Sequence, residues 1–478
     1  MTCTPRFVLL LLVLLLVLGA ASCGGGGRGA GEGPPDPPFQ PPDGDDQRLN
    51  TDQPGGQLSV FPEICCAGDR VYVTWYDRRD GDTDVYFSRS VDAGATWSES
   101  DVRLDTDDPG AAGSNVPRIC CDGDRVCVVW SDQRGTLSEI RANRSADGGA
   151  TWLAADVRVD RDAPADGSSW NPDVCCVGDS VYAVWQDSRN GLSDIYFSRS
   201  LDGGATWSAT DVRLDTDVAG AAMSEFPRIV CSGSLLYVVW QDERAGDPDV
   251  HCNVSADGGV TWLATDMRLD TDDPGAARSL QPHVACDGLR VGVVWSDDRD
   301  GQRDVRFNGS ADGGASWFVA DVRIETDAPG ASASLVPTLC LRGTDVAVTW
   351  EEFRGGLSDV YASRSTDGGA SWSLQDVRIN TDPAGTANAF LPEIAWGGSR
   401  LVVTWYDDRE GAFDVLLSTS EDGGTTWAEE ETRLDTDGEG AANSLAPSLC
   451  VSAERAHVVW YDQRDGPGDI HANHVTLP

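Results

Sequence analysis

Short apolar runs alternate with polar turn residues along most of the chain, and the pattern returns every 55 residues from about residue 48 onward. Within one period, Gly and Asp separate the apolar runs, which is typical of β-strands joined by tight turns. In the first period we expect four strands, at 62–67, 71–76, 85–90 and 97–105. The second strand is apolar on both faces, which suits a sheet packed between two others. Four-stranded sheets repeated around an axis form a β-propeller.

Two short motifs mark each period. Ser-x-Asp-x-Gly-x-Thr/Ser-Trp occurs seven times, and Trp-x-Asp/Glu-x-Arg occurs eight times. The aspartates of the first motif are Asp92, Asp147, Asp202, Asp257, Asp312, Asp367 and Asp422. The tryptophans of the second are Trp75, Trp130, Trp185, Trp240, Trp295, Trp350, Trp405 and Trp460. Such a repeat decides the fold class before any single residue does.

The first motif resembles the Asp box, or BNR repeat, of the sialidase-like propeller superfamily, and the repeats cover about nine-tenths of the chain. The resemblance implies that the box forms the turn between the third and fourth strands of a blade. It also implies that the box aspartate bonds to backbone amides of the turn and that the box tryptophan packs between blades. We therefore interpret the box aspartates as structural residues rather than as an active site.

The two ends of the repeat array complement each other. The last period, from Pro447 to Asn473, lacks its box and its fourth strand, whereas the segment 48–52 copies the fourth-strand end at 103–107. The N-terminal strand should therefore complete the last blade, which removes two open sheet edges. The prediction is an all-β, eight-bladed propeller of four-stranded antiparallel blades.

The first residues indicate export. Arg6 precedes an apolar run, 7–19, which is too short to cross a bilayer. The following Ala20-Ala21-Ser22-Cys23 is similar to a bacterial lipoprotein signal, in which Cys23 becomes a lipidated N-terminus; an ordinary secretory signal is the alternative. We expect a signal peptide at 1–22, a Gly/Pro-rich tether at 23–46 and the propeller at 47–478. The predicted location is extracytoplasmic, with only the lipid in the membrane.

Charge narrows the range of partners. The chain carries 36 basic and 78 acidic residues, a formal net charge of −42. Such a surface argues against nucleic acid and against adsorption to anionic lipids. A glycan or an extracytoplasmic protein remains as the expected partner, and no cofactor is predicted. The repeated paired aspartates, such as Asp105 and Asp107, are one place where calcium could bind through carboxylate oxygens.

Repeated charges should gather on one face of the propeller, where the turns between the second and third strands meet the connections between blades. They include the Asp-x-Arg pair, such as Asp77 and Arg79, and the acid that opens the third strand, such as Asp84. A carboxylate-binding role for these arginines is one reading. Because the arginine is present in all eight blades, we interpret it as a salt-bridge brace.

A ligand site is expected where the blades differ. The polar position after the proline of the innermost strand reads Glu63, Arg118, Asp173, Arg228, His283, Thr338, Glu393 and Ser448 around the ring. These residues, called the axial ring below, should surround the axial opening, and their charged members and His283 are the predicted ligand-binding residues; free drift at an exposed position is the alternative. Trp170 and the tyrosines Tyr76, Tyr406 and Tyr461 lie nearby in sequence.

The sequence favours binding over catalysis. Sialidases need three arginines, a tyrosine nucleophile paired with a glutamate, and an acid-base aspartate. Only Arg118 and Arg228 of the axial ring are arginines, and Tyr76 with Glu63 makes a weak candidate pair. We therefore expect a binding or scaffold module for a glycan or protein ligand, with an exo-sialidase-like glycoside hydrolase as the alternative.

Ten cysteines lie at two adjacent positions of the innermost strands, whose side chains face opposite sides of a sheet. One register would form disulfides between Cys65 and Cys121, Cys120 and Cys176, Cys175 and Cys231, and Cys450 and Cys66. The opposite register would pair Cys66 with Cys120, Cys121 with Cys175, and Cys286 with Cys340. Export permits disulfides, and small buried thiols are the alternative. No Cys-x-x-Cys with histidines is present, so no metal site is predicted.

Overall fold

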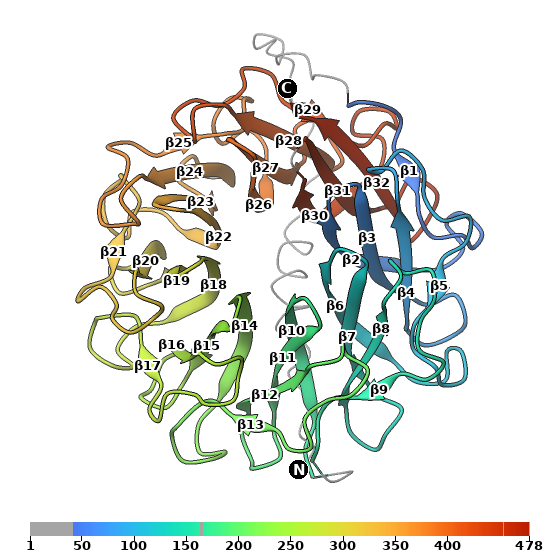
Figure 1. Cartoon of the computed structure of the whole chain (residues 1–478). Helices are drawn as coiled ribbons and strands as arrows, with labels where there is room; N and C mark the ends of the chain where they lie inside the picture. Colours follow the sequence, from blue (N-terminus) through green and yellow to red (C-terminus); the bar gives the residue numbers. More distant parts are fainter. Residues whose placement is uncertain (1–41, 163–165, 453, 478) are drawn as a thin grey trace, which may run out of the picture. The chain divides into compact units, whose positions relative to one another are not determined.

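The computed structural model describes residues 42–162, 166–452 and 454–477. These residues form 32 strands in eight four-stranded sheets, arranged around a central axis (Figure 1). The sheets are antiparallel, and the eight-bladed propeller predicted from the repeat is confirmed. Within the described ranges no helix is long and apolar enough to cross a membrane. The predicted signal peptide, Cys23 and most of the tether lie outside the described residues.

Each blade consists of strands A to D from the axis outward. Blade 1 contains β2 (Ser59–Ala67), β3 (Arg70–Asp77), β4 (Asp84–Ser90) and β5 (Val102–Arg103), and blade 2 contains β6 (Ser114–Asp122), β7 (Arg125–Asp132), β8 (Glu139–Ser145) and β9 (Val157–Arg158). Blade 3 contains β10 (Ser169–Val177), β11 (Ser180–Asp187), β12 (Asp194–Ser200) and β13 (Val212–Arg213), and blade 4 contains β14 (Ser224–Ser232), β15 (Leu235–Asp242), β16 (Asp249–Ser255) and β17 (Met267–Arg268). Blade 5 contains β18 (Ser279–Asp287), β19 (Arg290–Asp297), β20 (Asp304–Ser310) and β21 (Val322–Arg323), and blade 6 contains β22 (Ser334–Arg342), β23 (Asp345–Glu352), β24 (Asp359–Ser365) and β25 (Val377–Arg378). Blade 7 contains β26 (Ala389–Gly397), β27 (Arg400–Asp407), β28 (Asp414–Ser420) and β29 (Thr432–Arg433). Blade 8 contains β30 (Ser444–Val451), β31 (Arg455–Asp462), β32 (Asp469–Thr476) and β1 (Gln47–Arg48).

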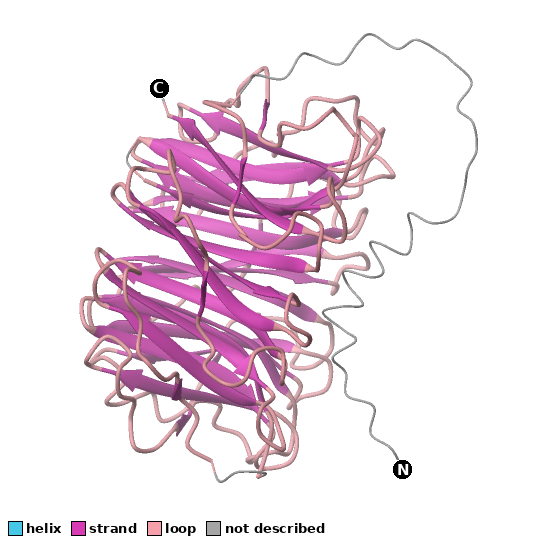
Figure 2. Ribbon diagram, turned by 90° about the vertical axis from the view of Figure 1, so that its right-hand side faces the viewer, coloured by secondary structure: helices cyan, strands magenta, loops and turns pink. Residues whose placement is uncertain are grey.

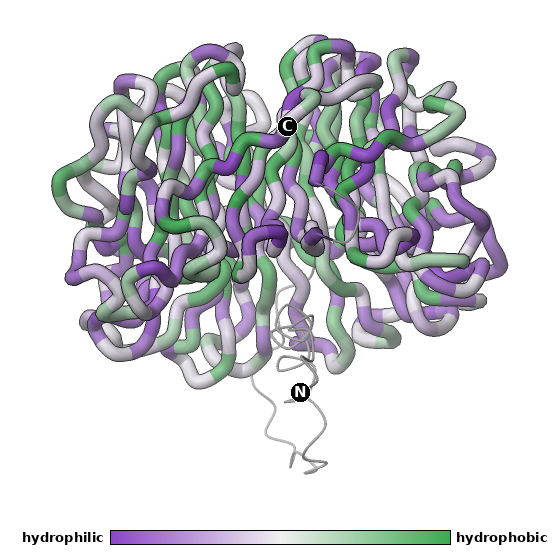
Figure 3. The backbone as a smooth tube through the Cα atoms, turned by 90° about the horizontal axis from the view of Figure 1, so that it is seen from below, coloured by the Kyte–Doolittle hydropathy of each residue, from purple (hydrophilic) through white to green (hydrophobic). Residues whose placement is uncertain are grey.

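Strand B forms the core of every blade. Val71, Tyr72, Val73 and Trp75 of β3 have no exposed surface, although they alternate between the two faces of the sheet. The eight strand-B tryptophans are all fully buried. Along the backbone, hydrophobic and hydrophilic stretches alternate throughout the propeller and do not separate into two halves (Figure 3). Burial of large aromatic rings between blades is a main source of stability for such a fold.

Strands A and D differ from the lengths expected in sequence. Strand D spans only Val102–Arg103 where 97–105 was expected, because the polar residues before it turn away and Asp101 binds Arg79 instead. Strand A begins earlier, at Ser59, and contains a bulge between Val60 and Glu63. The corresponding strands of the other seven blades carry the same register shift.

The last blade is closed by the N-terminal strand, as predicted. In β1, Gln47 pairs with Ala472 and Arg48 with His471 of β32. The Leu49 N–H then donates to the Ile470 carbonyl at 2.7 Å. Asp43 and Asp46, which the sequence assigned to the tether, also bond to the propeller: Asp43 accepts from Thr476 and Asp46 from Arg464.

The strands run between two opposite faces of the propeller, and each face carries its own set of turns (Figure 2). On one face, the box turn meets the turn between strands A and B, because the Ala93 N–H donates to the Asp69 carbonyl at 2.7 Å. On the other, the Asp82 N–H donates to the Gly110 carbonyl at 3.1 Å, which joins the B–C turn to the connection between blades. We call these the box face and the brace face.

Candidate functional site

The structure brings several axial-ring side chains into one electrostatic environment. Burial and the neighbouring Arg228 lower the pKa of Arg118 to about 10, while Asp173 and Glu393 oppose this shift. Burial, Arg228 and Arg118 lower the pKa of His283 to about 3, so this imidazole is neutral at pH 7. Residues of five blades therefore influence one another across the axis, as expected for side chains that line a channel.

Most of the axial ring also joins blade to blade. Its side chains accept hydrogen bonds from backbone N–H groups of the next blade: Asp173 from Ile229 (2.9 Å), His283 from Leu339 (3.4 Å) and Glu393 from Leu449 (2.7 Å). Glu63 accepts from the Arg118 guanidinium. These groups are half-buried and already engaged, which limits their freedom to perform acid–base chemistry.

Arg228 is a charged member of the axial ring that lacks such a contact. Among the described residues it makes no hydrogen bond or ion pair, although it is half-buried and acts on Arg118 and His283. A guanidinium has five N–H donors and keeps its charge at any physiological pH. Arg228 can therefore bind an oxygen-bearing ligand in the channel without first breaking a contact within the propeller.

Aromatic rings lie beside the axial ring toward the brace face. The Phe61 ring lies between Tyr76 of its own blade and Tyr461 of the last blade, with ring centroids 5.7 and 6.0 Å apart. Burial raises the pKa of Tyr461 to about 12 and raises those of Tyr76 and Tyr406 further. A phenolate nucleophile is disfavoured in such surroundings.

The candidate pair of Tyr76 and Glu63 receives no support from the contacts. Glu63 is bound to Arg118, and within the described chain no hydrogen bond joins it to Tyr76. In the sheet register Glu63 lies opposite Thr74, whereas Tyr76 lies opposite Val60. Trp170, noted in the sequence, lies opposite Gln186, whose side-chain oxygen accepts from the Phe226 N–H at 3.0 Å.

The box aspartates stabilise their turns. Asp92 Oδ1 accepts from the Thr96 N–H at 2.8 Å and Oδ2 accepts from the Thr96 hydroxyl at 2.6 Å. Ser90 donates to the same carboxylate at 2.8 Å. These hydrogen bonds lower the pKa of Asp92. The same contacts recur at Asp147, Asp202, Asp257, Asp312, Asp367 and Asp422.

The Asp-x-Arg motif forms a brace across the joint between blades. Arg79 binds Asp77 at 2.6 Å and Asp101 at 2.7 Å. Asp101 in turn accepts from the Thr51 N–H at 3.0 Å and from its hydroxyl at 2.7 Å. The predicted contact of Arg79 with Asp77 is therefore present, whereas Asp101 was not predicted as a partner, although an acid recurs at this position in every repeat.

A second arginine series, also missed in sequence, fills the acidic triads. Arg103 Nη2 contacts Asp84, Asp105 and Asp107 at 3.1, 2.8 and 2.7 Å. Equivalent triads are Asp194, Asp215 and Asp217; Asp249, Asp270 and Asp272; and Asp304, Glu325 and Asp327. Calcium at the paired aspartates would have to displace this guanidinium.

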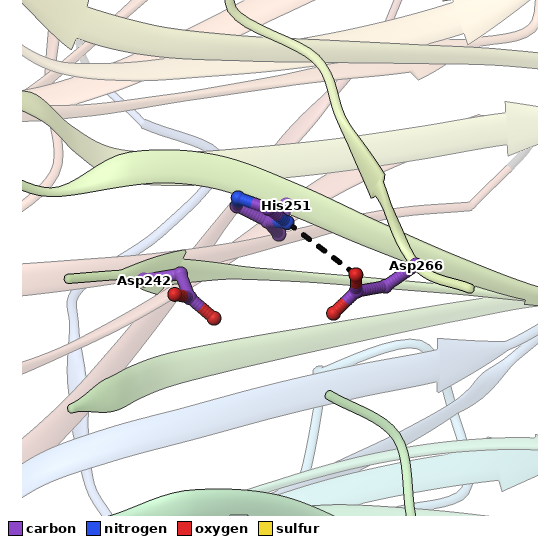
Figure 4. A group of neighbouring side chains, drawn as sticks. All are labelled: Asp242, His251 and Asp266. Carbon is purple, nitrogen blue, oxygen red and sulfur yellow. Dashed lines mark ion pairs between the residues drawn. The ribbon is translucent and has the colours of Figure 1, made fainter. Parts of the chain in front are cut away.

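Another carboxylate group contains a histidine (Figure 4). Asp242, His251 and Asp266 have ligand atoms close enough to surround an ion, and His251 Nδ1 lies 3.8 Å from Asp266. However, Arg244 binds Asp242 at 2.5 Å and Asp266 at 2.6 Å. This group is a brace with a histidine at its edge. Blade 8 repeats the arrangement with Asp46, Arg464 and His471.

The predicted disulfides are not formed in the structure, because the 12 described cysteines are free thiols. Their neighbours nevertheless follow the first predicted register. Thiols are neighbours in the pairs Cys65 with Cys121, Cys120 with Cys176, Cys175 with Cys231, and Cys450 with Cys66. Burial raises the pKa of the first cysteine in each pair, so these thiols are protonated at neutral pH.

A hollow of about 190 Å³ opens on the box face between blades 6 and 7. Trp396 lines it, and the Arg342 guanidinium lies 3.9 Å from the centre of the Trp396 ring. Trp396 is outside both tryptophan series, and that irregularity could have indicated the hollow.

No known family model matches the sequence, and no curated protein is similar to it. Solved structures with a related arrangement include the phage phi92 endosialidase, with a TM-score of 0.42 and 10% identity over 91% of this chain and 69% of that one. They also include polysaccharide lyase Uly1 (TM-score 0.47, 12% identity, 72% and 86% covered) and Penicillium chrysogenum α-L-arabinanase (0.42, 14%, 75% and 92%). Such low similarity does not indicate what this chain binds.

Proposed function

We propose that this chain is an exported, lipid-anchored propeller that binds a glycan or an extracytoplasmic protein through the axial ring. The observation that carries the proposal is Arg228, a half-buried guanidinium of the axial ring that has no partner among the described residues. Phe61 and Tyr76, both half-exposed, add aromatic surface beside the ring. Aromatic rings with a few convergent polar groups are typical of ligand sites.

Hydrolysis finds less support in the geometry than binding. An acid–base or nucleophilic group must be free to move a proton at the reacting bond. Glu63, Asp173 and Glu393 are each held by a contact within the propeller, and burial raises the pKa of Tyr76. The ring therefore has groups that can bind a ligand but lacks an evident catalytic pair.

Export and anchoring rest on the residues before the propeller. Cys23 with its preceding small residues supports lipidation, and a run of glycine and proline supports a tether. In a bacterial host, metabolic labelling with a fatty acid should mark the chain and place it in the membrane fraction. The Cys23→Ser variant should carry no fatty-acid label and should be absent from the membrane fraction. A fatty-acid label that persists in this variant would contradict the lipid anchor.

A binding screen tests the proposed role. The full chain, purified in detergent, is applied to a glycan array and to extracytoplasmic proteins of its host, and hydrolysis of a fluorogenic sialoside is measured in parallel. We expect selective binding and no turnover. Turnover that is lost in Tyr76→Phe or Arg118→Ala would instead support the hydrolase.

A further inference from the structure

His457 and His474 form a histidine pair at the joint where blade 8 meets blade 1. They lie directly opposite each other on β31 and β32, with ring centroids 6.0 Å apart. His457 is 2% exposed, and neither of its ring nitrogens has a hydrogen-bond partner among the described residues. A buried imidazole that satisfies neither nitrogen is costly, and an ion or a water is the usual explanation.

The two rings converge on one point. A methyl group on the α-carbon of Gly94 would lie 3.2 Å from Nδ1 of His457 and 3.3 Å from Nδ1 of His474. Gly94 belongs to the box turn of blade 1, so the space is bounded by the last blade and the first. Both Nδ1 atoms therefore approach the same side of Gly94, whose lack of a side chain permits this close approach.

Comparison between blades shows that the pair is special to this joint. In blade 1 the same two positions are Tyr72 and Arg89, whose side chains donate to carbonyls of the next blade: Tyr72 to Gly123 at 3.0 Å and Arg89 to Gly148 at 2.6 Å. At the last joint the histidines replace both donors. Blade 3 has the same pair of residue types in Tyr182 and Arg199, the other blades vary at these two positions, and blade 8 is the blade with two histidines there.

The protonation state suits a metal ligand. Burial, His474 and Arg455 lower the pKa of His457 to about 3, and burial with Arg455 lowers that of His474. Both imidazoles are therefore neutral at pH 7, the form that offers a lone pair to a metal. Asp43 and Asp92 place negative charge near His474, which favours a cation, whereas Arg455 opposes one.

We propose that His457 and His474 bind a divalent transition-metal ion of the zinc class, which links blade 8 to the box turn of blade 1. Imidazole nitrogens are preferred ligands of Zn²⁺ in tetrahedral sites. The two histidines supply two ligands, and water completes the coordination. This site is separate from the Asp242, His251 and Asp266 group, where Arg244 already supplies the positive charge.

Zinc titration of the metal-stripped full chain tests this site, with calorimetry for stoichiometry and Co²⁺ absorption as a spectroscopic probe of imidazole ligands. Wild type should bind one Zn²⁺ per chain with a rise in melting temperature. His457→Tyr and His474→Arg restore the residues of blade 1, so they should fold, and each should weaken Zn²⁺ binding at least ~10-fold. The matched control is His251→Tyr, because blade 1 has Tyr86 at this position with the Arg79 guanidinium 3.9 Å from the centre of its ring, and this variant should bind Zn²⁺ as wild type does.

Several outcomes would overturn the site. Wild type that binds no Zn²⁺ would remove it. Undiminished binding in both His457→Tyr and His474→Arg would assign the ion to the cysteines or to another group. Loss of binding in His251→Tyr alone would move the site to the Asp242 group. If either substitution lowers expression, His474→Asn removes the same ligand at a half-exposed position and provides the same readout.

Discussion

Arg48 and Asp469 are 421 residues apart in the chain and form a 2.9 Å ion pair in the last blade. Asn50 reinforces the contact, because its side-chain amide donates to Asp469 at 2.7 Å and its oxygen accepts from the Ile470 N–H at 2.8 Å. The N-terminal segment thus contributes a strand, a charge and a capping amide to a blade built by the C-terminus. The ring is closed by these contacts between the two ends of the propeller.

Removal of residues 47–53 should open the ring. The deletion breaks the β1–β32 pairing and removes the buried side chain of Leu49, so the melting temperature should fall by at least about 5 °C. Circular dichroism melts of the full chain and the deletion measure this. A matched deletion within the outer tether, residues 30–36, should leave the melt unchanged. Equal melts for both deletions would contradict closure by the N-terminal strand.

The acidic triads predict that the stability of the propeller depends on pH. Exchange of aspartate and asparagine at matching positions of two blades should reverse this dependence. Burial and Asp84 raise the pKa of Asp105 to about 8, whereas the matching position in blade 6 is Asn380. Asn380 donates to Asp359 at 2.9 Å and to Asp382 at 2.7 Å, as a protonated aspartate could. We therefore predict that Asp105 carries a proton at neutral pH and donates it to a flanking carboxylate.

The sign follows from the raised pKa of Asp105. Because folding takes up a proton, this contribution is fully present below about pH 4 and is lost as the pH rises through about 8. The free energy of unfolding of Asp105→Asn should match that of wild type near pH 4 and exceed it by roughly 1–3 kcal/mol at pH 9. Asn380→Asp should show the reverse, with a stability loss that grows with pH. Denaturant unfolding at several pH values measures both, and identical pH profiles for the two variants would refute the shared proton.

The cysteine contacts predict oxidative cross-links between blades. Oxidised glutathione should convert each of these neighbouring thiol pairs to a disulfide, because two electrons and two protons pass from the protein thiols to glutathione disulfide, which becomes two molecules of reduced glutathione. Non-reducing peptide mapping should find Cys65 joined to Cys121 and Cys450 joined to Cys66. The disulfide between Cys450 and Cys66 would join blade 8 covalently to blade 1 and raise the melting temperature. Cys286 has no such partner and should remain free or form a mixed disulfide; random pairing would contradict the register.

The fold was predictable because its signals are repeated. Each strand-B tryptophan recurs at one spacing, and the incomplete last period matched the N-terminal copy, so both blade number and closure followed from counting. The short strand D was not predictable, because the tertiary contact of Asp101 with Arg79 competes with strand pairing in residues that alternate normally. Periodicity gives the positions of residues along a strand but not which charges meet across a joint.

The candidate site was only partly predictable for the same reason. The axial ring followed from differences between blades, and its residues do influence one another in the structure. That Arg118 is paired and Arg228 is free depends on side-chain contacts between blades, which the spacing does not contain. The convergence of His457 and His474 on Gly94 required the closure joint in three dimensions.

The affinity of the Arg228→Ala chain for the strongest ligand from the binding screen tests the central claim most directly. Arg70→Ala removes the same charge from a half-exposed arginine on the box face and serves as the matched control. If the axial ring binds the ligand, Arg228→Ala should weaken binding at least tenfold, about 1.4 kcal/mol, while Arg70→Ala stays near wild type. Equal affinity of Arg228→Ala and wild type would contradict binding through the axial ring.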